Sequence, residues 1–131
     1  MTYHKALLIP INSERQIFIQ DRRGFKAPDW GFFGGSIEAG ESPIEAVIRE
    51  TKEELVITLE PQELVYLGNF YTEYEDEQIW RDFYVYKTDR SNFDVQEGKG
   101  GKWVTAVEAK AVLLQAEHFD TLWDAIQKVI L

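Results

Sequence analysis

The segment from Ser42 to Leu55 carries the strongest helix signals in the chain. Ser42 can accept a hydrogen bond from a free N–H group of the first turn, Pro43 suits the first helical position, and Glu45 follows the cap by three residues, as in a capping box. Because each helical residue turns by about 100°, one apolar arc is shared by Ile44, Val47, Ile48, Thr51 and Leu55. The pattern predicts a helix over residues 43–55 whose apolar face packs against a sheet.

Three carboxylates of this helix, Glu50, Glu53 and Glu54, fall on the arc beside the apolar face. Arg49 and Lys52 are expected on the far side. Like charges three and four residues apart repel, at a cost of about 0.2–0.5 kcal/mol per pair. On this spacing alone, an exposed helix face is the commoner explanation. Carboxylates converging at the margin of a core also suit hard cations such as Mg²⁺ or Mn²⁺, so both explanations stay open at this point.

The rest of the chain alternates short apolar runs with turn residues. Strands are expected over residues 6–11, 17–19, 30–35, 64–71, 79–86 and 103–105, and helices over 106–114 and 119–130. Loops are expected over 21–29 and 91–101, and an acidic connection that includes Glu73 and Glu77 joins two of the strands. Strands that precede and follow a helix, with terminal helices, predict an α/β fold: a mixed sheet with helices on its faces.

The chain has 131 residues, 44% of them hydrophobic, with no cysteine and a formal net charge of -9. A single domain over residues 1–131 is expected, long enough to bury a core. The negative charge argues against polymeric nucleic acid and anionic membranes as partners, and the missing cysteines exclude thiol chemistry. No apolar run suits a signal peptide or a membrane span, so a cytoplasmic protein is the expectation.

From Gly35 to Ile57 the chain reads G-x5-E-x7-R-E-T-x-E-E-x-V-I, which resembles the signature of the Nudix hydrolases, G-x5-E-x7-R-E-U-x-E-E-x-G-U with U apolar. The matching positions are Gly35, Glu41, Arg49, Glu50, Glu53 and Glu54. Val56 departs from the pattern, because the family has glycine there in the turn that leaves the helix. A match at this many positions is far more specific than a lone glycine motif.

The resemblance implies an α/β/α sandwich with a mixed sheet and a catalytic site that uses Mg²⁺ or Mn²⁺. It implies that the metal ligands are Glu50, Glu53, Glu54 and the backbone carbonyl of Gly34. Glu53 and Glu54 would thereby be catalytic, and Arg49 would orient a helix glutamate by a charge-assisted hydrogen bond. Gly35 would let the loop approach the metal and the substrate phosphates, since it lacks a Cβ. Glu41 would be structural.

Outside this box, residues 96–104 resemble the loop before a late strand in the mutator-type nucleoside triphosphate pyrophosphohydrolases. That resemblance implies a role for Glu97 in metal binding or as a general base; an exposed loop glutamate is the alternative. Residues 17–23 resemble the family's second strand, which implies that Arg22, in preference to Arg23, reaches the phosphates. Charge balance on an acidic surface is the alternative for either arginine.

A nucleobase needs aromatic stacking partners. The candidates are Phe32, Phe33, Tyr71, Tyr74 and Trp80, with Phe33 taken as a substrate-binding residue; packing in the core is the alternative for each.

The chemistry implied by the resemblance is attack of water on a phosphorus of a nucleoside diphosphate linked to a group X. The compact length and the Glu97 loop favour a (d)NTP or a similar small nucleotide. Alternatives are a dinucleoside polyphosphate or nucleotide-sugar hydrolase, a Nudix domain that senses a nucleotide without cleaving it, and a structural protein with a coincidental box. A homodimer is possible, because dimers are common among such relatives. No residue points to an oxidised guanine.

Overall fold

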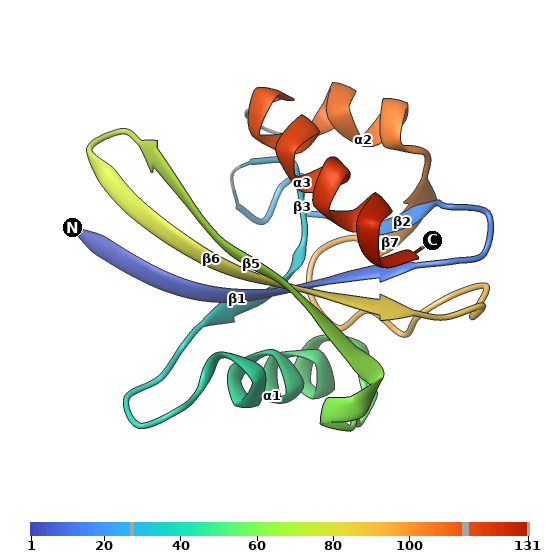
Figure 1. The fold of residues 1–131 in the computed structure, drawn as a ribbon, viewed down its shortest axis with the longest axis horizontal. Helices are drawn as coiled ribbons and strands as arrows, with labels where there is room; N and C mark the ends of the chain where they lie inside the picture. The colour runs from blue at the N-terminus through green and yellow to red at the C-terminus, as the bar shows by residue number, and fades with distance from the viewer. Residues whose placement is uncertain (27, 114–115, 131) are drawn as a thin grey trace.

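The structure is a computed structural model that describes residues 1–26, 28–113 and 116–130. The strands are β1 (Thr2–Ile11), β2 (Ile17–Asp21), β3 (Trp30–Gly31), β4 (Phe33–Ser36), β5 (Leu64–Tyr74), β6 (Glu77–Lys87) and β7 (Gly101–Val104). The helices are α1 (Pro43–Leu55), the short 3-10 helix η1 (Pro61–Glu63), α2 (Ala106–Val112) and α3 (Ala116–Ile130). Helix α1 covers one face of the sheet and helices α2 and α3 cover the other (Figure 1).

Strand β1 organises the sheet, whose order is β3-β2-β1-β6-β5. It pairs in parallel with β6 along its whole length, from Thr2 opposite Gln78 to Ile11 opposite Lys87. Its other side pairs antiparallel with β4 over residues 5–8 and with β2 at Ile11. Strand β7 pairs with β2, and β5 forms an edge beside β6. The mixed sheet and the sandwich predicted from the sequence are therefore confirmed.

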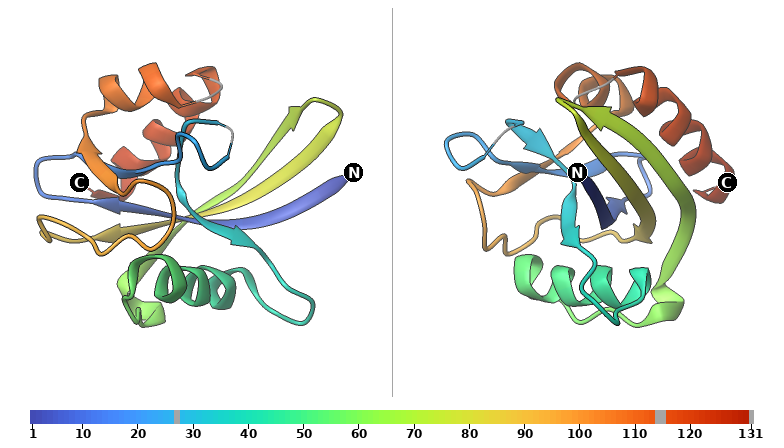
Figure 2. Two further views of the ribbon diagram at one scale, coloured as in Figure 1. Left: turned by 180° about the vertical axis from the view of Figure 1, so that it is seen from behind. Right: turned by 90° about the vertical axis from the view of Figure 1, so that its left-hand side faces the viewer.

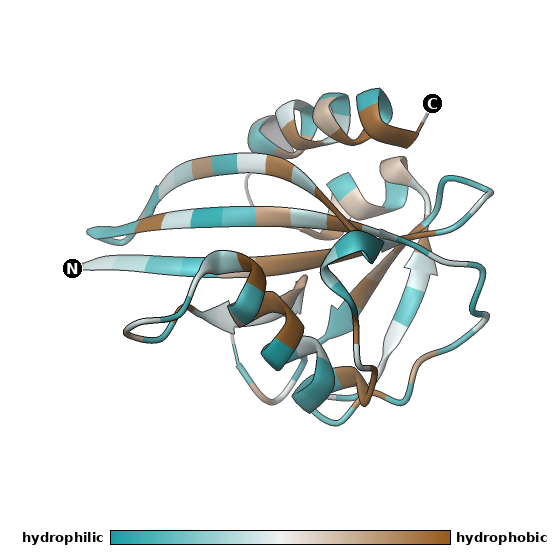
Figure 3. Cartoon of the chain, turned by 60° about the horizontal axis from the view of Figure 1, so that its bottom comes forward, coloured by the Kyte–Doolittle hydropathy of each residue, from teal (hydrophilic) through white to brown (hydrophobic). Residues whose placement is uncertain are grey.

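Alternation along β1 builds two cores, because successive side chains of a strand point to opposite faces. Ala6 and Leu8 pack in the cluster that faces α1, whereas Leu7 and Ile9 pack in the cluster that faces α2 and α3. With both faces covered, the inner part of β1 is a continuous apolar run, which Figure 3 shows turning from hydrophilic near the N-terminus to hydrophobic between the helices.

The β5–β6 hairpin extends past the helical layers, beside the N-terminal half of β1 (Figure 2). Both strands are longer than predicted, and a two-residue turn replaces the expected acidic loop. Glu75 and Asp76 occupy that turn with φ of 47° and 68°, in the left-handed region that tight hairpin turns require. Cross-strand pairing of Tyr74 with Glu77 overrides the low strand propensity of the acidic residues.

Helix α1 begins and ends as its local chemistry predicts. Ser42 Oγ accepts from the N–H of Glu45 at 3.3 Å, and Glu45 Oε1 accepts from the N–H of Ser42 at 2.9 Å. Val56 ends the helix in the left-handed region, with φ 57° and ψ 38°. A second capping box, Thr105 with Glu108, starts α2 and was not predicted. Leu114, placed in that helix from the sequence, lies outside the described residues. No helix in the described ranges has the length and apolar character to cross a bilayer.

Candidate active site

A cavity of about 750 Å³ gathers most of the chemistry predicted from the sequence. Its lining includes residues of strands β1 to β6, of helices α1 and α3, and of the loops after β2 and before β7. The side chains that line it include the carboxylates of Glu50 and Glu97 and the aromatic rings of Phe32 and Phe70. Its basic side chains are Lys5, Arg22, Lys26 and Arg81. A protein of net charge -9 thus concentrates cations beside carboxylates in one hollow.

Glu54 is the buried carboxylate of the site, with only 4% of the residue exposed. Its Oε1 accepts a hydrogen bond from the N–H of Gly34 at 2.9 Å, so two of the predicted ligand residues are in contact. Burial raises the pKa of Glu54 to about 8, and the charges of Glu50 and Glu97 add to that rise while the Gly34 bond opposes it. The fold therefore places a negative group where its charge is costly.

Arg49 is the hub of the helix carboxylates and does not lie on the far side of α1, as the helical arc suggested. Its Nε and Nη2 donate to Glu41 at 2.8 and 3.0 Å, and its Nη1 donates to Glu50 Oε1 at 2.9 Å. A long side chain reaches round the helix, so the direction of its Cα–Cβ bond does not fix the position of its charge. The guanidinium holds the pKa of Glu41 at about 2, and it orients Glu50 as the resemblance implied.

Glu53 does not converge with the other two helix glutamates as predicted. Its side chain is 61% exposed and its Oε1 lies 3.7 Å from Arg49 Nη1, whereas the Glu50 side chain is 18% exposed. Within the described residues, no three histidine or acidic side chains form a group that could hold a metal ion. Glu50 and Glu53 lie beside Arg49 Nη1, whereas Glu54 is bonded to the N–H of Gly34.

The donors nevertheless fit a hard divalent cation in their chemistry, since all of them are oxygens. The close packing of Gly35 supports this fit: a Cβ at that position would lie 2.7 Å from Glu50 Oε1. At Gly34 a Cβ would overlap the carbonyl oxygen of Ala6, and φ is 129°. Only glycine lets the chain pass this close to the carboxylates.

Glu97 reaches the same cavity because its loop is tied to α1 and β2. The N–H of Gln96 donates to the carbonyl of Glu54 at 2.8 Å, and Gln20 Nε2 donates to the carbonyl of Glu97 at 3.3 Å. The Glu97 side chain is 59% exposed, and Lys26 Nζ lies 4.0 Å from it. A residue distant from α1 in the sequence therefore lines the cavity, and its charge interacts with that of the buried Glu54.

The structure separates the two candidate arginines. Arg22 lines the cavity, and its guanidinium interacts with the charges of Glu54 and Glu97. Arg23 turns away, because its Nη2 forms an ion pair with Asp21 at 2.7 Å and its guanidinium lies over the Trp30 ring at 5.0 Å. The geometry agrees with the preference for Arg22.

The choice of Phe33 as a substrate-binding residue is wrong. Phe33 is 0% exposed and its ring stacks on Phe18 at 5.7 Å, on the α1 side of the sheet. Phe32, which lies between β3 and β4, packs on the opposite face of the sheet and lines the cavity instead. Of the other candidates, Tyr71 also lines it, whereas Trp80 packs on Tyr71 at 4.7 Å. The side chain of Tyr74 lies outside the described part of the chain.

A family model for the NUDIX domain matches residues 2–125 of the chain. The chain belongs to the NUDIX domain family. The family predicted from residues 35–57 is thereby confirmed.

Two curated relatives are similar to this Nudix chain. The 8-oxo-dGTP diphosphatase of Escherichia coli K12 is 33% identical over 102 residues, which cover 76% of this chain and 78% of the relative. An oxidized purine nucleoside triphosphate hydrolase of Danio rerio is 30% identical over 84 residues, which cover 64% of this chain and 53% of the relative. Together with the family match, they confirm the prediction of a pyrophosphohydrolase enzyme.

Solved structures agree on the fold. A MutT protein of Methanosarcina mazei superposes with a TM-score of 0.77 at 18% identity, covering 97% of this chain and 94% of that one. A MutT structure described for Aliivibrio salmonicida and Vibrio cholerae has a TM-score of 0.71 at 27% identity, covering 98% and 99%. The α/β/α sandwich is therefore the fold of this Nudix domain.

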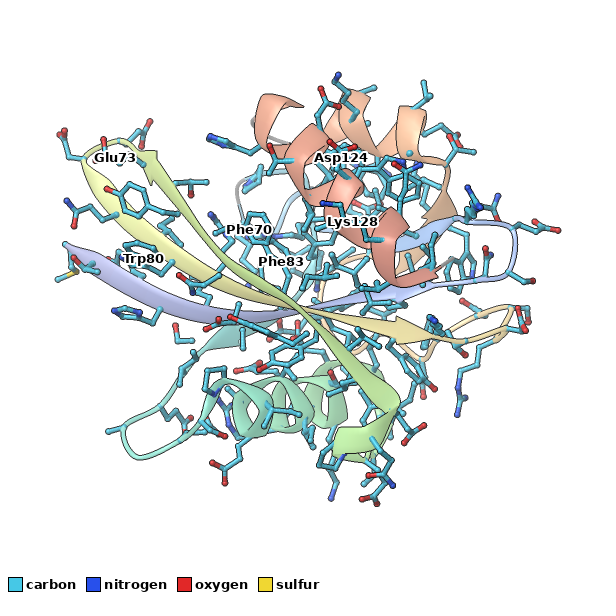
Figure 4. All side chains as sticks on the ribbon, in the orientation of Figure 1. Phe70, Glu73, Trp80, Phe83, Asp124 and Lys128 are labelled. Carbon is cyan, nitrogen blue, oxygen red and sulfur yellow. The ribbon has the colours of Figure 1, made fainter. Side chains whose placement is uncertain are left out.

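The cavity also contains residues that the sequence reasoning missed. Phe70 and Phe83 lie side by side on the α3 side of the sheet (Figure 4), with ring centroids 5.6 Å apart. The rings of Phe83 and Phe32 are 5.5 Å apart. Lys5 and Arg81 lie beyond them along β1 and β6. Alternation of side chains along a strand could have indicated this, because residues two apart share a face of the sheet: Lys5 with Leu7, and Arg81 with Phe83.

Proposed function

We propose that this Nudix enzyme hydrolyses a small nucleotide, in preference a (deoxy)nucleoside triphosphate, and that it requires Mg²⁺ or Mn²⁺. One observation carries the proposal: a single cavity brings together carboxylates, half-buried cations and aromatic rings. We call its acidic side, with Glu50 and Glu97, the carboxylate wall, and its aromatic side, with Phe32, Phe70 and Phe83, the aromatic wall. A nucleoside triphosphate needs all three, because it combines a flat base with a chain of negative charges. The relatives named above also act on nucleoside triphosphates, according to their names.

The aromatic wall suits the base. Phe32, Phe70 and Phe83 form a chain of edge-to-face contacts. Stacking of one base on such a ring is worth about 1–3 kcal/mol. We assign base binding to Phe32 and Phe70 in place of Phe33.

The carboxylate wall suits the cation. Glu50, Glu54 and the carbonyl of Gly34 would hold it, with Glu53 and Glu97 as further oxygen donors. A bound divalent cation polarises a phosphoryl group and lowers the pKa of a bound water. The chain's own residues supply the rest: Arg49 orients Glu50, Gly35 admits the phosphates to the carboxylates, and Arg22 neutralises phosphate charge.

In the hydrolysis itself, the oxygen of water bonds to one phosphorus as the bridging P–O bond breaks. The bridging oxygen and its electron pair leave with the other phosphate group. The proton of the water passes to a base, for which Glu97 is the candidate because it lines the cavity and its charge interacts with that of Glu54.

The test is a panel of nucleotides in Mg²⁺ with the products identified. It includes the four dNTPs, 8-oxo-dGTP, ADP-ribose, a dinucleoside tetraphosphate and a nucleotide sugar. We expect a nucleoside monophosphate and pyrophosphate from a triphosphate, no products in EDTA, and a rise in melting temperature on adding Mg²⁺. Hydrolysis of the dinucleotide or the sugar conjugate, with every triphosphate left intact, would overturn the preferred substrate.

A matched control distinguishes the loss of a carboxylate at the proposed cation site from the loss of a carboxylate elsewhere on the protein. Glu60→Gln removes one carboxylate from an exposed position outside the cavity and should leave turnover and the Mg²⁺ response unchanged. Equal losses in Glu60→Gln and Glu54→Gln would contradict a specific cation site. A homodimer and a cytoplasmic location remain predictions; light scattering on the purified protein measures the former.

A further inference from the structure

Lys5 and Arg81 lie opposite each other in the parallel pair of β1 and β6. Both line the cavity and neither is fully exposed, so the two side chains share one face of the sheet. Adjacent strands are about 4.8 Å apart, and like charges directly opposite each other destabilise a sheet. Two neighbouring cations at the floor of a cavity therefore need an explanation.

The fold does little to offset this repulsion. The pKa of Lys5 is lowered first by burial and then by the charges of Arg81, Arg22 and Lys26, with Glu77 opposing them weakly. The pKa of Arg81 is lowered by burial and by Arg22. Within the described chain, neither Lys5 nor Arg81 has an acidic partner within 4.0 Å, and Arg81 Nη1 donates to Thr72 Oγ1.

Among the described residues, some other cations of this acidic protein form ion pairs. Arg23 pairs with Asp21 at 2.7 Å, and Lys110 pairs with Asp120 at 2.8 Å. With 23 acidic and 14 basic residues in the chain, carboxylates are in excess. Positive charge concentrated at Lys5 and Arg81 thus fits an anion that comes from outside the chain.

Arg22 connects this pair to the carboxylate wall. Arg22 lines the same cavity, and its charge interacts with those of Glu54 and Glu97 as well as with those of Arg81 and Lys5. The cavity thus holds three neighbouring cations, Lys5, Arg22 and Arg81, together with the carboxylates Glu50 and Glu97. A chain of several phosphates carries enough negative charge to pair with all three cations, whereas a single diphosphate bridge carries less.

We propose that Lys5 and Arg81 form a second anion subsite, which binds the terminal phosphates of a polyphosphate chain whose bond to be cleaved lies at the carboxylate wall. This inference rests on the proposed function and narrows it. The substrates are nucleosides that carry three or more phosphates, and nucleoside diphosphates joined to an uncharged group are poor substrates.

A binding experiment tests the subsite without any turnover. Inorganic tripolyphosphate is titrated calorimetrically into the protein in EDTA at low salt. Wild type should bind it, and Lys5→Gln/Arg81→Gln should bind it about tenfold more weakly or worse, because charge-assisted hydrogen bonds to an anion are lost. The control Lys87→Gln/Arg90→Gln removes the same charge from exposed positions outside the cavity and should bind as wild type does. No binding by wild type, or an equal loss in the control, overturns the subsite.

Single variants guard against a folding defect. Lys5→Gln relieves repulsion, so it should raise the melting temperature at low salt while it weakens tripolyphosphate binding; a lower melting temperature with unchanged binding would mean a purely structural lysine. Arg81→Lys keeps the charge and should retain most of the binding. If Arg81→Lys weakened tripolyphosphate binding as much as Arg81→Gln does, the bond of Arg81 to Thr72 would be its main role, and its place in the subsite would be overturned.

Kinetics then separate this inference from the proposed function. With the preferred base, the double variant should lower kcat/KM for the triphosphate about tenfold, mainly through KM, and change that for the corresponding diphosphate less than twofold. Equal losses on both nucleotides would contradict a subsite for terminal phosphates. If no nucleotide is hydrolysed at all, the proposed function fails, and the tripolyphosphate titration still decides whether the subsite exists.

Discussion

Glu54 Oε1 accepts a hydrogen bond from the backbone N–H of Gly34 at 2.9 Å, which fixes a buried carboxylate of α1 against β4. The contact joins the two halves of the signature, the glycine turn and the helix. It also explains why burial of a charge is tolerated: one donor is supplied by a glycine whose φ of 129° other residues rarely adopt.

Glu54→Gln should lower turnover and raise stability together. Loss of the charge should reduce turnover by about 100-fold or more, at least as much as the loss of a residue that only orients a metal ligand. Because the native pKa is about 8 and the unfolded value is 4.5, the native carboxyl stays protonated while the unfolded one ionises, so the free energy of unfolding falls as pH rises from 4.5 to 8. In EDTA at pH 8 the variant should therefore melt above wild type. Glu53→Gln, at an exposed position, should lose turnover but change stability by less than about 0.5 kcal/mol.

Val56→Gly should stabilise the protein. Val56 has φ 57°, a left-handed conformation that costs a residue with a Cβ about 1–2 kcal/mol. Glycine avoids this strain, but its greater flexibility in the unfolded state costs about 0.5–1 kcal/mol of folding free energy. With 60% of Val56 exposed, little burial is lost, so a net gain of about 0.5–1 kcal/mol is expected in urea unfolding. Val107→Gly, at an exposed position inside α2, should have the opposite sign. A loss of stability in both variants would show that Val56 is not strained.

The Asp21–Arg23 pair should stabilise the folded protein at pH values above about 4 and lose this effect in acid. Hydrogen bonds from the Arg23 side chain lower the pKa of Asp21 from 3.8 to about 2. A lowered native pKa stabilises the fold above the unfolded pKa, and this contribution disappears as pH falls from about 4 to 2. Asp21→Asn should flatten the decline of melting temperature across that window, whereas Asp120→Asn, at an exposed pair, should keep the wild-type slope.

Phe33→Ala should mainly lower stability, whereas Phe32→Ala should mainly weaken nucleotide binding. Removing the fully buried Phe33 ring should cost about 3–5 kcal/mol of unfolding free energy. Phe32→Ala should cost less and should raise KM for the nucleotide, because its ring borders the cavity. Chemical denaturation and KM, measured on both proteins, decide the assignment. A larger KM effect for Phe33→Ala would restore Phe33 as a base-stacking residue.

The sequence by itself determined the elements whose signals are local. Ser42 and Glu45 cap α1, the apolar residues of α1 repeat with the helical period, and the apolar run over residues 6–11 marks a strand. The same stretch carries the Nudix signature, so the family could be read from residues 35–57. Local capping and periodicity need no distant partner, which is why they can be read directly.

Only the tertiary structure decided which distant residues share the cavity. The N–H of Gln96 is bonded to the end of α1, so Glu97 reaches the cavity, and the register of β1 with β6 sets Lys5 beside Arg81. Phe33, the first residue of β4, packs in the core, whereas Phe32, between β3 and β4, lines the cavity. Strand register and parity depend on pairing between segments far apart in the chain, and no local pattern specifies them.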